Sequence, residues 1–246
     1  MKRAIRISIL AILAFAIIVL ARLPASWIRR FVPRGITCSE LAGTAWNGSC
    51  SNLVYNGAPL GQLDWQLHPL SLLRGRVAAF VDLTRGDQEF IRGDFERRGG
   101  DIYVAHDLQA QLPLDPPLLP QLDSGFSGAI SVNLESIEVR KNVIAAIVGQ
   151  VQATSLYSKR DRVEIGGYSV TFPNKPAGTE PVGEVTSLEG PVDFQGTLKL
   201  TRQPGWLVEG KVRTKPETPR DLVQQLGYLG PPDAQGFRPL SLEGTF

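Results

Sequence analysis

The most apolar stretch of the chain lies near its N-terminus. Ile7–Ala21 has no charged residue and a single hydroxyl, and an arginine stands at each end of it. A membrane-spanning helix needs about 20 apolar residues, whereas the core of a cleaved signal peptide needs about 7–15. Because the flanking arginines can extend the reach of the segment, we expect an uncleaved anchor over residues 7–23. A signal peptide cleaved near Pro24-Ala25-Ser26 is the alternative.

The anchor prediction divides the chain into four parts. Residues 1–6 form a short N-terminus, 7–23 the anchor, 24–40 a basic juxtamembrane linker, and 41–246 a separate domain. Trp27 is typical of a membrane interface. The residues expected to lie in or at the bilayer are Ile7, Leu10, Leu13, Ile17, Leu20 and Trp27.

Beyond residue 40 apolar and polar residues alternate with a period of two, which indicates half-buried strands. Leu63, Trp65 and Leu67 alternate with polar residues. The clearest strand is Asp101–Leu112, whose even-numbered residues should share one apolar face. This places His106 in the core.

Turn and helix signals connect these strands. Asn56-Gly57 predicts a hairpin, and Thr218 followed by Pro219 predicts the N-cap of a short helix ending at Gly227. Pro69–Leu73 fits one helical turn. Asn142–Thr154 fits a buried strand or a helix, and Asn174–Val185 has the composition of a loop.

The sum is an all-β domain of about ten strands. Its connections are too short for parallel crossovers, so the sheet should be antiparallel. One face is apolar and must be covered or closed over.

Charge is distributed unevenly along the chain. The formal net charge is +2, yet seven of the 26 basic residues and no acidic residue precede Gly35. The rest carries 19 basic against 24 acidic residues. The basic junction suits the lipids of an inner membrane, whereas the mildly acidic domain argues against nucleic acid as a partner.

The two cysteines, Cys38 and Cys50, have eleven residues between them. A disulfide closing this loop would stabilise the fold by about 3 kcal/mol and would persist only in an oxidising compartment. The expected topology therefore has a cytoplasmic N-terminus and a periplasmic domain in a bacterial envelope. Two buried free thiols are the alternative.

Residues suited to catalysis are sparse. His68 and His106 are the only histidines, and no zinc-binding, thiol-redox or serine-nucleophile motif occurs. We expect no catalytic residue, no metal or cofactor site, and no enzymatic activity.

Three motifs follow one another between residues 43 and 76. They read G-T-x-W-x-G, L-G-x-L-x-W-x-L and P-L-x-L-L-x-G. Their most distinctive members are Gly43, Trp46, Gly48, Gly61, Trp65, Pro69, Leu70 and Gly75. This order resembles the type II secretion system protein N family, and the resemblance extends more weakly over nearly the whole chain.

The resemblance implies a non-catalytic, single-pass inner-membrane component of the machine that exports folded proteins. It implies a strongly curved periplasmic half-barrel like those of AsmA and other lipid-transport proteins. The expected partners are the L and M platform subunits, with the outer-membrane secretin as a further candidate.

Two functions remain open. The domain could be a scaffold whose exposed strand edges pair with partner strands. Alternatively, its apolar concave face could hold an acyl chain.

Overall fold

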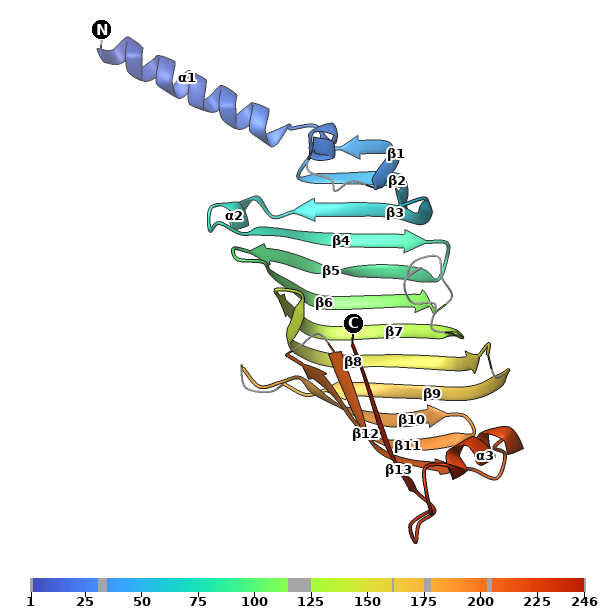
Figure 1. Ribbon diagram of the computed structural model, residues 1–246. Helices are drawn as coiled ribbons and strands as arrows, with labels where there is room; N and C mark the ends of the chain where they lie inside the picture. The colour runs from blue at the N-terminus through green and yellow to red at the C-terminus, as the bar shows by residue number, and fades with distance from the viewer. Residues whose placement is uncertain are drawn as a thin grey trace.

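The computed structural model describes residues 2–30, 35–114, 125–160, 162–174, 178–202 and 205–245. Its body is one antiparallel sheet of thirteen strands that lie side by side in chain order (Figure 1). The strands are β1 Ile36–Gly43, β2 Asn47–Tyr55, β3 Ala58–Leu67, β4 Val77–Arg85, β5 Glu89–Arg98, β6 Ile102–Pro113, β7 Phe126–Arg140, β8 Val143–Ser158, β9 Val163–Phe172, β10 Val182–Glu189, β11 Val192–Thr201, β12 Gly205–Thr214 and β13 Arg238–Thr245. The all-β, antiparallel prediction is confirmed.

Helices contribute little to this body. They are α1 Lys2–Ala21, the 3-10 helix η1 Ala25–Arg30, α2 Pro69–Leu72 and α3 Arg220–Gly227. α1 projects away from the sheet (Figure 1). Among the residues that the structure describes, no helix has both the length and the apolar character that a membrane span requires. The membrane anchor therefore stays a prediction.

One predicted hairpin turn and most of the predicted strands are present in the sheet. Asn56 and Gly57 both have positive φ, of 49° and 88°, which is the geometry of a tight hairpin turn between β2 and β3. Residues 143–154 belong to β8. For the segment 142–154 the strand prediction is therefore confirmed, and the alternative of a helix is wrong. Two strands were missed: β1 begins at Ile36, before the expected start of the domain, and β10 begins at Val182 inside the expected loop.

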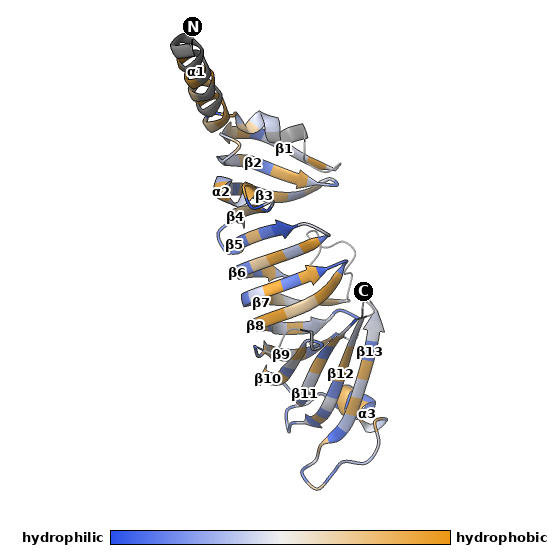
Figure 2. Cartoon of the chain, turned by 90° about the vertical axis from the view of Figure 1, so that its left-hand side faces the viewer, coloured by the Kyte–Doolittle hydropathy of each residue, from blue (hydrophilic) through white to orange (hydrophobic). Residues whose placement is uncertain are grey.

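The sheet has one apolar face, but only part of it is packed into a core. One buried cluster contains Leu134, Ile147, Phe172 and Leu200. The second contains Val185, Val192, Phe194 and Val212, and α3 packs against it. Both lie in the half of the sheet from β7 onwards. Figure 2 shows apolar residues continuing along the strands of the other half.

The prediction for His106 was wrong, because β6 contains a bulge. Arg92 pairs with Gln109 and Asp94 with His106, so one extra residue lies in β6. That residue is Asp107, with φ of 49°. The bulge reverses the alternation, because a register shift of one residue exchanges the two faces. Thus Tyr103 and Ala105 share the apolar face with Leu108, and His106 is exposed on the other.

The predicted N-cap of the last helix was also wrong. α3 has Pro219 at its N-cap position and no side-chain cap. The Thr218 hydroxyl instead donates to the Pro191 carbonyl at 2.5 Å and accepts from the Lys215 N–H at 2.8 Å. Thr218 therefore ties the segment before α3 to the β10–β11 turn.

The direction of the strands rotates strongly between β1 and β13 (Figures 1 and 2). Gly196 of β11 pairs with Gly210 of β12, and the two strands lie so close there that a side chain on either glycine would meet the backbone of the other. A Cβ on Gly210 would lie 2.7 Å from the Gly196 Cα and 2.8 Å from the Phe194 ring. The aromatic ring thus fills the space that the two missing side chains leave. Within the described residues the sheet does not close, since β1 and β13 each pair with one strand.

Candidate functional site: an uncovered apolar face joined to the N-terminal helix

The joint between α1 and the sheet is built by the first family-like motif. The Trp46 indole N–H donates to the Leu20 carbonyl at 2.7 Å. This carbonyl belongs to the last turn of α1, where the helix supplies no i+4 donor. The Ala45 N–H donates to the Leu23 carbonyl at 2.8 Å, and Pro24 forms a β-bridge with Thr44. The end of α1 is therefore attached to the β1–β2 turn.

Trp65, the tryptophan of the second motif, contacts the same β1–β2 turn. The Trp65 indole N–H donates to the Ala45 carbonyl at 3.2 Å. A Cβ on Gly48 would lie 2.5 Å from the Trp65 ring, so the ring needs a glycine there. The Leu67 N–H donates to the Trp46 carbonyl at 2.7 Å. The two motifs thus form one unit.

The glycines of the motifs are placed at turns and at close approaches. Gly43 and Gly61 have φ of 81° and 101°, and a Cβ on Gly61 would lie 2.1 Å from the Thr84 carbonyl oxygen. Gly75 ends the α2 turn with φ of 68°. Pro69 is at the start of α2, and Leu70 beside it is exposed.

The cysteines and the expected anchor residues lie on either side of this joint. Cys38 and Cys50 form a disulfide, with Cα atoms 5.9 Å apart, between β1 and β2. The side chains of Ile7, Leu10, Leu20 and Trp27 are exposed. Nothing is described for the side chains of Leu13 and Ile17.

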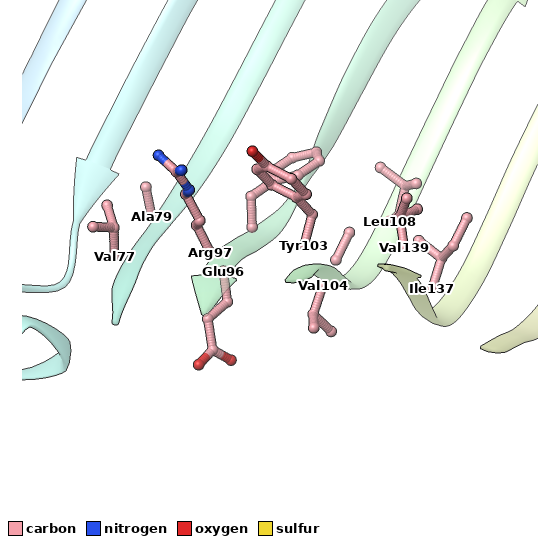
Figure 3. A pocket seen from close by; sticks show the side chains of 11 residues that line it. Val77, Ala79, Glu96, Arg97, Tyr103, Val104, Leu108, Ile137 and Val139 are labelled. Carbon is pink, nitrogen blue, oxygen red and sulfur yellow. The ribbon is translucent and has the colours of Figure 1, made fainter. Parts of the chain in front are cut away.

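A groove of about 360 Å³ crosses the apolar face of β4–β7. Figure 3 shows Val77, Ala79, Arg97, Tyr103 and Val139 on one side of the strands, whereas Glu96 points to the other. The Arg97 guanidinium lies 5.6 Å from the Tyr103 ring centre, a cation–π distance. Apart from this charge and the Tyr103 hydroxyl, the groove is lined by apolar side chains.

The corresponding region of β9–β13 is partly covered by α3. Leu222 and Leu226 of α3 line a second cavity of about 320 Å³ together with Tyr168 and Phe194. Burial, together with the charge of Asp193, raises the pKa of Tyr168. α3 therefore covers one part of the apolar face and leaves the groove of β4–β7 open.

Ion pairs support the strands beside each of these cavities. The Arg98 guanidinium donates to Glu96 at 3.0 Å, and this bond is the main reason that the pKa of Glu96 is lowered. The Arg213 guanidinium donates to Asp193 at 2.8 Å and, with Lys215, lowers the pKa of Asp193. The Arg98–Glu96 pair lies within β5, whereas the Arg213–Asp193 pair joins β12 to β11.

The arrangement suits binding and attachment. Among the described residues no three His, Cys, Asp or Glu side chains come together as metal ligands. His68 approaches Asp94 at 4.0 Å in an exposed position, and His106 lies exposed on a different strand. The sequence pattern missed Tyr103 and Ala105 as groove residues, because only the positive φ of Asp107 reverses their face.

Comparison with known proteins gives one consistent result. The family model described as type II secretion system protein N matches residues 34–241. The chain is 26% identical over 262 aligned positions to a type II secretion system protein N of Aeromonas hydrophila, and 25% identical over 260 to one of Vibrio cholerae serotype O1. Each alignment covers 99% of both chains. No solved structure matches the chain. The chain therefore belongs to the type II secretion system protein N family.

Proposed function

We propose that the protein is a non-catalytic inner-membrane subunit of the type II secretion machinery that acts through contacts of its periplasmic sheet. The observation that carries this proposal is a sheet with a partly uncovered apolar face in a chain of this family. The accessible surface is 16420 Å². A compact protein of this mass would expose about 10,800 Å². A surface this large favours a role in assembly.

The proposed topology places residues 1–6 in the cytoplasm, 7–23 in the membrane, and the sheet, which begins with β1 at Ile36, in the periplasm. The linker that starts at residue 24 lies at the interface. The exposed apolar side chains of α1, such as Ile7, Leu10 and Phe15, support it, since such a surface is unfavourable in water. The Cys38–Cys50 disulfide is consistent with an oxidising compartment. Extraction of membranes with alkaline carbonate tests the anchor: the full chain should stay in the pellet, and release would contradict it.

The proposed mechanism is pairing of strands at the free edges. β1 and β13 each leave one row of main-chain groups unpaired within the described sheet. η1 contacts β1, whereas β13 has no comparable cover among the described elements. β13 is thus the edge we assign to a partner, with the L and M platform subunits as first candidates and the secretin as another.

Deletion of the gene in the host bacterium tests the function. Exported enzymes should then accumulate in the periplasm, and the full chain supplied from a plasmid should restore export. Undiminished export from the deletion strain would contradict the proposal.

Binding of an acyl chain is a second candidate function, favoured by the open groove. Its volume lies within the range of about 300–1,000 Å³ that is usual for small-molecule sites, and its lining is apolar. A photo-crosslinking amino acid in place of Phe95 should then capture lipid in cells, whereas the same substitution at Leu188 on β10 should not. Equal capture at both positions would remove this candidate.

A further inference from the structure

The third motif presents three leucines to solvent at one end of the sheet. Leu70 is 74% exposed, Leu72 43% and Leu73 84%. All three lie in or next to α2, between β3 and β4. Contiguous exposed apolar side chains on a soluble domain mark interaction sites.

Hydrogen bonds hold this turn in one shape. The Ser71 hydroxyl donates to the His68 carbonyl at 2.6 Å and accepts from the Ala78 N–H at 3.2 Å. The N–H groups of Arg74 and Arg76 donate to the Ser71 carbonyl at 3.0 and 3.1 Å. Ser71 therefore faces the sheet. Because these hydrogen bonds fix the backbone of the turn, the three leucines are held in their exposed positions.

The turn is adjacent to the place where α1 joins the sheet. Leu20 of α1 accepts from Trp46, and the carbonyl of Trp46 accepts from Leu67, which lies two residues before α2. Figure 1 shows α2 at the same end of the strands as this joint. A bilayer that receives α1 would thus have its surface close to the leucines.

The charges around the turn suit a lipid surface. Residues 68–76 include Arg74 and Arg76 and no acidic residue, and Arg76 pairs with Glu96 of β5 at 3.1 Å. Arg74 is exposed, and at the same end of the strands Lys141 lies in the β7–β8 turn beside Arg140, which pairs with Glu138. Apolar side chains flanked by basic ones are the usual composition of segments that lie in the headgroup region.

We propose that Leu70, Leu72 and Leu73 insert into the same anionic bilayer as α1, with Arg74 at the lipid headgroups. This second contact fixes the tilt of the sheet relative to the membrane, which a single helix cannot do. The proposal rests on the membrane anchor proposed above.

Spin labelling of the full chain in vesicles tests this contact. Because Cys38 and Cys50 are bonded to each other, a single introduced cysteine carries the label. The variants are Leu73→Cys at the turn, Leu10→Cys in α1 and Leu188→Cys on β10 as the water-exposed control. The readout is collision with oxygen, which partitions into lipid, against collision with a water-soluble nickel complex.

We expect the oxygen-to-nickel ratio of the labels at positions 73 and 10 to be severalfold higher than at position 188. In vesicles of zwitterionic lipid alone, the ratio at 73 should fall toward that at 188. A lipid signal at 10 with a water signal at 73 would overturn this inference and leave the anchor intact. Water signals at both would overturn both proposals.

Two further results would count against the proposal. A label at 73 shielded from oxygen and from nickel would indicate a protein contact, such as a second copy of the chain, in place of lipid. A ratio at 73 that is equal in anionic and zwitterionic vesicles would overturn the role of the lipid charge.

Discussion

Trp46 is one of the residues that connect the N-terminal helix to the sheet. Its indole N–H reaches the Leu20 carbonyl, and its own carbonyl accepts from Leu67 in β3. The sequence predicted Trp46 as a motif residue, but no pattern indicated its partner, because Leu20 lies 26 residues earlier. Long-range hydrogen bonds of this kind depend on the folded geometry.

Replacing Trp46 by Phe keeps an aromatic side chain, although a smaller one, and removes the donor. A hydrogen bond of this type contributes about 1 kcal/mol, so the joint should open about fivefold more often. Limited trypsin cleavage of the full chain after Arg22, carried out in detergent so that the end of α1 is accessible, should accelerate by about that factor. Trp206→Phe, on β12, is the matched control and should cleave at the normal rate; equal rates for both variants would contradict the role of Trp46.

The glycine pair of β11 and β12 gives a second prediction at this scale. In Gly210→Ala the new Cβ would lie 2.4 Å from the Gln195 carbonyl oxygen and 2.7 Å from the Gly196 Cα. Overpacking of this kind costs about 1–3 kcal/mol. Gly227→Ala in α3 is the control, since nothing lies within 4 Å of its Cβ position. Urea unfolding should show a loss only for the first variant.

At the scale of elements, local signals predicted the strands better than their faces. The alternation of apolar and polar residues correctly predicted β3, β6 and β7, and Asn56-Gly57 correctly predicted a hairpin turn. β10 was missed because its first residues follow a loop rich in proline and glycine. The face of Tyr103 was assigned wrongly, because a bulge at Asp107 is set by pairing with β5 and leaves no mark on the hydrophobic pattern.

The junction of β11 and β12 predicts a dependence of stability on pH. Hydrogen bonding to Arg213 lowers the pKa of folded Asp193 below the unfolded value, which is about 3.9. The pair therefore stabilises the fold above that pH and loses its effect as the pH falls through the lower, folded pKa. The free energy of unfolding should drop less between pH 6 and about pH 3 in Asp193→Asn than in the wild type.

Asp87→Asn, in the exposed β4–β5 turn, is the control for removal of a carboxylate. It should retain the pH dependence of the wild type. An Asp193→Asn profile that runs parallel to the wild-type profile would show that the Arg213 pair does not contribute.

α3 provides the other test at this scale. Leu222 and Leu226 line the covered cavity, whereas Val223 is exposed. Leu222→Ala should cost about 1–2 kcal/mol, less than a fully buried leucine, and should increase binding of a hydrophobic dye. Val223→Ala should change neither; a similar loss in both variants would show that α3 does not cover the cavity.

At the scale of the whole molecule, the described sheet is open, with β1 and β13 as its edges. One part of its apolar face is packed beneath α3, and the groove of β4–β7 is not. The family could be identified from the order of three short motifs, yet the extent of uncovered surface could not, because it depends on which elements fold back over the sheet. That surface and the β13 edge are where we expect partners to bind.

The most direct test of this account is photo-crosslinking in the host bacterium from the β13 edge. Leu242 on β13 and Leu188 on the internal strand β10 are matched in residue type and exposure, at 49% and 48%. The full chain with the crosslinker at position 242 should capture a platform subunit of the secretion machinery, and the chain with it at 188 should not. Capture of no secretion component from 242, or equal capture from both positions, would contradict the account.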